Sequence, residues 1–175
     1  MSLNLHFAGT LQNESSKIFR VDRERKTIDL SGVEIEEDIR EKVLQMFDPA
    51  QRNMAHALGF QFLKMSRKEM IARMPVDENT TQPFGILHGG ASVALAETLC
   101  SIGAWLSIDI EKKMAVGLEI NANHVRPVRK GGSVVGKATP IHRGASTQIW
   151  EIRIETESGK LVSISRCTIA VIDRR

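Results

Sequence analysis

The stretch ILHGGASVALAETLCSIGAWL, residues 86–106, decides the fold. From residue 91 onward its only charged side chain is Glu97, and it has the length of a long helix that is apolar on nearly every side. Because a helix that is apolar all round must be buried, we expect this one at the centre of the domain. A carboxylate in such a helix is costly to bury unless it has a partner.

The rest of the chain is expected to supply strands. Segments rich in Val, Ile and Thr follow residue 109, with glycine-containing turns between them, and two shorter candidate strands separated by the turn 66–68 precede the long helix. The predicted strands are 61–65, 69–75, 114–125, 133–142, 147–156 and 161–172. One helix with several antiparallel strands predicts an α+β fold, with an antiparallel sheet wrapped around a long central helix at about 89–108.

The N-terminal part follows a different pattern. Apolar residues recur at helical spacing over 35–47, and the pair Asp48-Pro49 is expected to end that helix and start a second, short one. We therefore expect an N-terminal extension, 1–47, that is partly helical and has no assignable role. The main domain would be 48–175.

Composition is that of an ordinary soluble globular protein, with 175 residues, 42% apolar and 26% charged. The net charge of +3 comes without a dense basic block, and only 5% of residues are aromatic, so no nucleic-acid surface is expected. No membrane span or signal peptide is expected either. The two cysteines, Cys100 and Cys167, suit neither a disulfide framework nor a zinc site, which favours a cytoplasmic protein without metal.

Glu97 is the first candidate for chemistry. It could pair with an arginine, reach the surface, or act as an acid or base, and the helix alone leaves these alternatives open. Ser101 lies one helical turn further on, so its hydroxyl shares the face of Glu97 and could position a water molecule or the carboxylate.

The start of the helix, His88-Gly89-Gly90, is the second candidate. The first turn of a helix leaves backbone N–H groups unpaired at the positive end of the helix dipole. An N–H of Gly89 or Gly90 is therefore a candidate oxyanion donor to a carbonyl group. The alternatives are an ordinary glycine turn and a histidine that only caps the helix. The sequence has no Gly-x-Ser-x-Gly elbow, phosphate-binding loop or His-Glu-x-x-His motif, which leaves the carboxylate, this helix start and the amide of Gln82.

Basic residues gather near two predicted strand ends. Arg126 lies close to Arg129 and Lys130, and Arg143 precedes the loop 144–147. Arginines beside backbone N–H groups and hydroxyls suit phosphate recognition. Solvated strand ends are the ordinary alternative.

Several blocks taken together resemble a known family. They are QPFGILHGGAS at 82–92, LAET at 95–98, VGLEINANHVR at 116–126, PIHRG at 140–144 and QIWEI at 148–152. In that order they are similar to hot-dog-fold acyl-CoA thioesterases of the group that comprises the 1,4-dihydroxy-2-naphthoyl-CoA, phenylacetate-degradation and Arthrobacter-type 4-hydroxybenzoyl-CoA enzymes. The resemblance covers about residues 53–172, and the N-terminal extension has no counterpart in it.

The resemblance implies a hydrolysis of acyl-CoA thioesters with roles for particular residues. Glu97 is implied as the nucleophile or general base, assisted by Ser101. The Gly89 N–H would polarise the thioester carbonyl, and Gln82 and His88 would fix that end of an aromatic or hydroxyaromatic acyl group. The residues implied to hold the CoA portion are His124, Arg126, Arg143, Gly144, Ser146 and Thr147. Because CoA belongs to the substrate, no cofactor is expected.

A homodimer with shared active sites, paired further into a tetramer, is also implied. Gly89 and Glu97 are eight residues apart, which is about 12 Å along a helix. One thioester carbon cannot meet both groups of the same chain, because each must approach within roughly 3 Å. Two antiparallel helices related by a two-fold axis would bring Gly89 of one chain beside Glu97 of the other.

Two other functions remain open. A hot-dog hydratase or dehydratase would need a His–Asp pair on the helix, which carries only Glu97. A non-catalytic acyl-CoA-binding module is the other alternative, although binding alone has no need of that acid.

Overall fold

The computed structural model describes residue 30 and residues 32–47 and 52–174. The elements in chain order are β1 (Glu34–Ile35), the 3-10 helix η1 (Glu37–Ile39), α1 (Arg40–Met46), α2 (Met54–Ala57), β2 (Gln61–Met65), β3 (Met70–Pro75), α3 (Gly89–Leu106), β4 (Lys113–His124), β5 (Ser133–Arg143), β6 (Thr147–Thr156) and β7 (Leu161–Asp173). The expected strands and the central helix are confirmed, with ends that differ by one residue or none for the strands.

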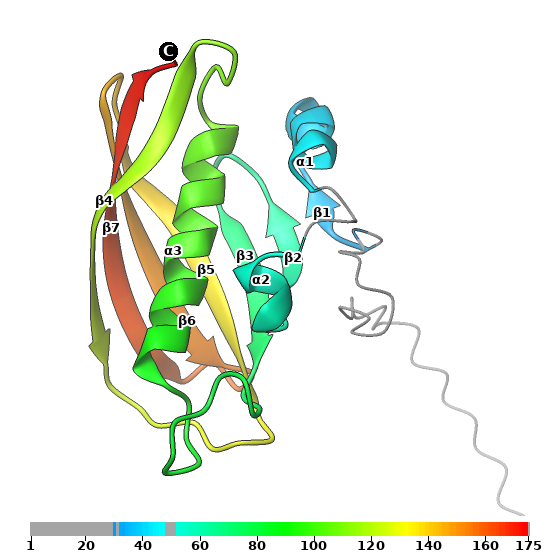
Figure 1. Cartoon of the computed structure of the whole chain (residues 1–175), viewed down its shortest axis with the longest axis vertical. Helices are drawn as coiled ribbons and strands as arrows, with labels where there is room; N and C mark the ends of the chain where they lie inside the picture. The colour runs from blue at the N-terminus through cyan, green and yellow to red at the C-terminus, as the bar shows by residue number, and fades with distance from the viewer. Residues whose placement is uncertain (1–29, 31, 48–51, 175) are drawn as a thin grey trace, which may run out of the picture.

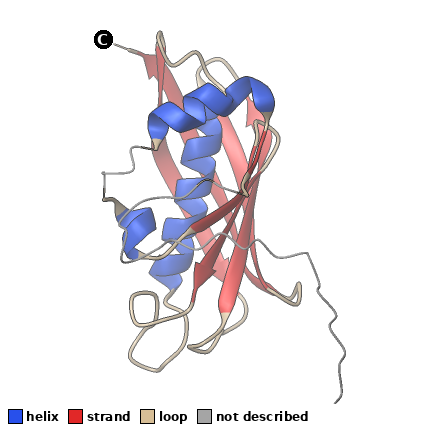
Figure 2. Ribbon diagram, turned by 90° about the vertical axis from the view of Figure 1, so that its right-hand side faces the viewer, coloured by secondary structure: helices blue, strands red, loops and turns tan. Residues whose placement is uncertain are grey.

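The strands form one seven-stranded sheet in the order β1-β2-β3-β5-β6-β7-β4. All neighbours are antiparallel except β1 and β2, which are parallel. Helix α3 lies along one face of this sheet, and the strands curve past it (Figures 1 and 2). The predicted α+β architecture is therefore present, with β4 at one edge of the sheet.

Close packing of α3 on the sheet depends on small residues. A Cβ at Gly103 would lie 2.6 Å from the ring of Trp150, so the helix can approach β6 only because position 103 is glycine. Cys100 on α3 and Cys167 on β7 are both free and buried. Hydrogen bonding to the Cys167 thiol and burial raise the pKa of the Cys100 thiol, which therefore stays protonated at neutral pH.

The expectation that α3 is buried on every side is wrong for a single chain. The sheet covers the face with Leu95 and Leu99, both fully buried, but Glu97 is exposed on the opposite face. By length and composition α3 could cross a membrane, but half of it is buried within the fold, as is typical of a core helix. The face of α3 that carries Glu97 is therefore not covered by any described part of this chain.

The segment 34–46, inside the predicted N-terminal extension, packs into the main core. Ile35, expected to begin a helix, lies in β1 and pairs with Met65 of β2. Ile39 and Val43 have no exposed surface and belong to the same core as the side chains of α3. The predicted boundary at 47/48 thus crosses a continuous core.

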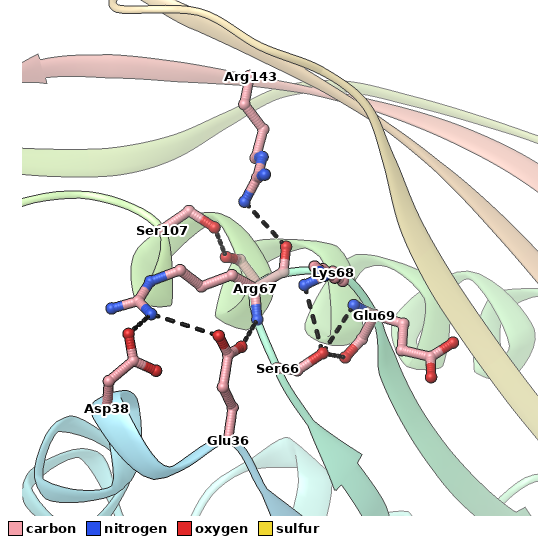
Figure 3. Close-up of polar contacts among 9 residues, drawn as sticks. Glu36, Asp38, Ser66, Arg67, Lys68, Glu69, Ser107 and Arg143 are labelled. Carbon is pink, nitrogen blue, oxygen red and sulfur yellow. Dashed lines mark hydrogen bonds and ion pairs between the residues drawn. The ribbon is translucent and has the colours of Figure 1, made fainter.

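Polar contacts fix the same segment to the turn between β2 and β3 (Figure 3). The Glu36 carboxylate accepts a 2.7 Å hydrogen bond from the Arg67 backbone N–H, and the Arg67 guanidinium contacts both Glu36 and Asp38. These ion pairs are partly exposed, so each contributes little, and the apolar contacts supply most of the attachment.

Replacing Ile39 by alanine should lower the free energy of unfolding by about 2–4 kcal/mol, because it removes a large, fully buried side chain. Leu44→Ala is the matched control, since Leu44 is 58% exposed and its loss should change stability by about 0.5 kcal/mol or less. Denaturant unfolding of both variants measures the difference. Equal, small effects would show that this segment does not share the cooperative core.

Candidate active site

The loop before α3 is held in place by backbone hydrogen bonds. The His88 N–H donates to the Thr80 carbonyl and the Leu87 N–H to Val128, both at 2.8 Å. Gln82 donates to Ile86 at 2.9 Å, which closes a turn in which Gly85 has a φ of +73° that favours glycine. This arrangement fixes the position from which the helix starts.

His88 caps α3, which is one of the alternative roles considered for it from the sequence. Its Nδ1 accepts a 2.8 Å hydrogen bond from the Gly90 N–H, so that N–H is already used. For the Gly89 N–H, the structure gives no acceptor among the residues it describes. Gly89 therefore presents the free donor at the positive end of the α3 dipole.

A cavity of about 380 Å³ opens beside this helix start. It lies between the N-terminus of α3 and the segment that follows β4. Its lining residues are Gln82, Ile86, Leu87, Gly89, Ser92, His124, Val125, Arg126, Pro127 and Val162. Four of the residues given a role from the sequence thus meet in one cavity, whereas Pro127 and Val162 lie outside every motif block.

Glu97 lies two turns further along α3 and does not line this cavity. Its Oε1 lies 3.2 Å from the point where a Cβ at Gly117 would stand, so the carboxylate rests against β4 where that strand has no side chain. Ser101, one turn beyond, is half-buried. Gly117 is a functional candidate that sequence reasoning missed, because only the pairing of helix and strand reveals it.

The two arginines predicted to hold CoA lie far apart within one chain. Arg126 donates through Nε to the Leu161 carbonyl at 3.1 Å, and Leu161 pairs with Glu155 on β6. Arg143 pairs with Gln148 on the same strand. Gln148 and Glu155 are seven residues apart on β6, which corresponds to roughly 23 Å along the strand. A single chain therefore does not offer both arginines to one CoA diphosphate.

Arg143 and the loop after it already have partners. The Arg143 guanidinium donates to the Arg67 carbonyl at 3.0 Å (Figure 3). The Gly144 N–H donates to the Thr147 carbonyl at 2.8 Å, and the Ser146 carbonyl accepts from Val171 at 2.8 Å. These bonds shape a tight turn between β5 and β6, at the opposite end of the sheet from the cavity.

Strand β4 leaves apolar side chains in solvent along the free edge of the sheet. Leu118 is 64% exposed, and Met114 and Val116 are also exposed. This edge adjoins the uncovered face of α3 that carries Glu97 (Figure 1). An edge strand with unpaired backbone groups and apolar side chains is a ready template for pairing with another strand.

Comparisons with known proteins agree with this architecture. The profile of the thioesterase superfamily matches residues 84–163. A Bacillus subtilis protein with a provisional esterase name is 48% identical over 124 residues, which is 71% of this chain and 98% of the relative. The 1,4-dihydroxy-2-naphthoyl-CoA hydrolase of Escherichia coli is 48% identical over 120 residues, 69% of this chain and 87% of that enzyme.

Solved structures show the same fold. A Staphylococcus aureus protein, described in one of its structures as a thioesterase enzyme, is 38% identical with a TM-score of 0.67 over 70% of this chain and all of that chain. Two of its structures are alanine variants, one of a glutamate and one of a glutamine fifteen residues before it.

The chain belongs to the thioesterase superfamily and has its hot-dog fold. It is a thioester hydrolase, and its family acts on CoA thioesters. The resemblance drawn from the sequence motifs is thereby confirmed.

Proposed function

We propose that this enzyme hydrolyses an aromatic or hydroxyaromatic acyl-CoA to the free acid and CoA. Glu97 acts as nucleophile or general base, and the Gly89 N–H stabilises the oxyanion. The observation that carries the proposal is the free Gly89 donor facing a cavity whose lining includes Ile86, Leu87 and Val162. A mostly apolar cavity with a few polar groups suits an apolar acyl group whose carbonyl must be held in one place.

The position of Glu97 is supported by spacing. Gln82 and Glu97 are fifteen residues apart, the same separation as the glutamine and glutamate that were replaced in the S. aureus protein. A thioester is reactive enough that a carboxylate and an oxyanion donor can suffice. We therefore propose Gln82 and His88 as the groups that orient the acyl carbonyl, and Ser101 as the neighbour that assists Glu97. No cofactor has a role in this reaction.

A second chain is part of this proposal. Gly89 and Glu97 of one chain are about 12 Å apart along α3, too far to act on one carbon. Pairing of two β4 edges would cover the exposed Leu118 and lay the open faces of two α3 helices together, antiparallel about a two-fold axis. Each site would then combine Gly89 from one chain with Glu97 from the other. We propose this homodimer, paired again into a tetramer, as the working form in the cytoplasm.

The assay that tests the function is release of free thiol from a panel of acyl-CoA substrates. We expect the highest kcat/KM for benzoyl-type and naphthoyl-type substrates, and lower values for medium aliphatic chains. Preference for the aliphatic chains would overturn the aromatic assignment. Tight acyl-CoA binding without thiol release would indicate a binding module, and addition of water to an enoyl-CoA without thiol release would indicate a hydratase.

Arg126 should contribute to CoA binding, because it lines the cavity and forms no ion pair with another described residue. Arg126→Ala is expected to raise KM for acyl-CoA about tenfold, with little change for an acyl-pantetheine that lacks the nucleotide. Arg143→Ala tests whether the turn between β5 and β6, supplied by a second chain, also contributes to CoA binding, and the proposed role predicts the same substrate dependence. Equal losses on both substrates would contradict a phosphate-binding role for either arginine.

A further inference from the structure

His124 lies against the oxyanion end of the site. A Cβ at position 89 would stand 2.9 Å from His124 Nε2, so the Nε2 edge of the imidazole faces Gly89 directly. Position 89 must be glycine for this contact to exist. His124 also lines the cavity together with Gln82. The resemblance to relatives implied a CoA contact for His124, but its ring lies against Gly89, whose N–H has no acceptor among the described residues.

Ser163 is the cross-strand neighbour of His124. The register pairs His124 on β4 with Ser163 on β7, and directly opposed residues in antiparallel strands have Cβ atoms about 5 Å apart. Ser163 has no exposed surface, and its hydroxyl has no hydrogen-bond partner among the described residues. A buried hydroxyl without a partner is costly, and its cross-strand neighbour His124 carries a ring nitrogen that can accept a hydrogen bond.

We propose that His124 is a second oxyanion donor, through Nε2–H, and that Ser163 positions it. This inference rests on the proposed thioesterase site. Gly90 cannot supply the second donor from the backbone, because its N–H is bound to His88. In the proposed site the Ser163 hydroxyl donates to Nδ1, which leaves the proton on Nε2. His124 keeps this proton throughout, and its hydrogen bond to the carbonyl oxygen strengthens as negative charge develops there.

The test compares His124→Ala and His124→Gln on an acyl-CoA and on the matching acyl-pantetheine. Loss of one oxyanion donor should lower kcat about 100-fold on both substrates, with little change in KM. Glutamine can place an N–H donor near the position of Nε2, so His124→Gln should recover part of the lost kcat. An increase in KM confined to the CoA substrate, with kcat unchanged, would overturn the proposal and return His124 to CoA binding.

Ser163→Ala tests the positioning role, with Ser165→Ala as its matched control. Ser165 is also a buried β7 serine whose hydroxyl has no partner among the described residues, but it pairs with Ala122 instead of a histidine. Ser163→Ala should lower kcat about fivefold, the weight of one neutral hydrogen bond, and Ser165→Ala should leave kcat unchanged. In the His124→Ala background, Ser163→Ala should have no further effect. Equal effects of the two serine variants would overturn the positioning role.

These outcomes are separate from a failure of the proposed function. If the wild-type enzyme released no thiol from any acyl-CoA, the function itself would be wrong. If the wild type were active while both His124 variants kept full kcat, only the second donor would be wrong. Thermal unfolding of every variant shows whether a lost activity reflects a lost fold.

Discussion

Replacing Glu97 by alanine is expected to lower kcat for acyl-CoA hydrolysis by about 1,000-fold or more while leaving substrate binding nearly intact, because it removes an essential catalytic group. Glu97 is the only acid on α3, and its carboxylate rests against Gly117 on the open face of the helix. No hydrogen bond or ion pair ties the Glu97 carboxylate to another described residue, so its loss should cost the fold little. Single-turnover and steady-state rates, with binding measured separately by calorimetry, check this result.

Glu119→Gln is the control for a general effect of charge near this site. Glu119 lies on β4 and, like Glu97, is close enough to act electrostatically on the Cys167 thiol. Its replacement should change kcat by less than about threefold, in the range of an exposed charge. Residual activity of Glu97→Ala within about tenfold of wild type, which is about 1.4 kcal/mol of barrier, would remove Glu97 from the central role.

Placing an arginine at Leu118 is expected to convert the enzyme to monomers and to lower kcat/KM by about 100-fold or more, since half of each site would be lost. Leu118 is 64% exposed on the free edge of the sheet, where the proposed pairing of β4 strands would bury it. An unpaired charge at the centre of such an interface is strongly unfavourable. Analytical ultracentrifugation and activity, measured at the same protein concentration, test both parts.

Ile141→Arg is the matched control. Ile141 is 60% exposed, about as much as Leu118, but it lies on β5 away from the free edge. This variant should remain dimeric and active. A Leu118→Arg enzyme that is monomeric and fully active would show that each site is complete within one chain.

The fold could be read largely from local patterns. Alternation of Ile with polar residues placed β6 at its observed bounds, because strands with one buried face follow a period of two. The His88-Gly89-Gly90 segment also predicted the start of α3. Such features depend on neighbouring residues, and the sequence contains them directly. Segment 34–46 was harder, since the burial of Ile39 and Val43 comes from contacts far along the chain.

The site was predictable only in part. The motifs identified Gln82 and Gly89 as neighbours, and the cavity brings them together. Complete burial of α3 was wrong, because a hydrophobic pattern cannot distinguish a face covered by its own sheet from one left open. The separation of Arg126 from Arg143 and the contact of His124 with Gly89 follow from strand register, which residue spacing alone does not reveal.

The central claim is that each active site joins Gly89 of one chain to Glu97 of another, and complementation between two inactive variants tests it most directly. One chain carries Glu97→Ala, and the other carries Gln82→Ala and His88→Ala. Both are refolded together at equal amounts, and heterodimers are verified by mass. Random pairing makes about half of the dimers mixed, each with one intact site of two, so about a quarter of wild-type activity should return. No recovery in a sample with verified heterodimers would contradict the shared site.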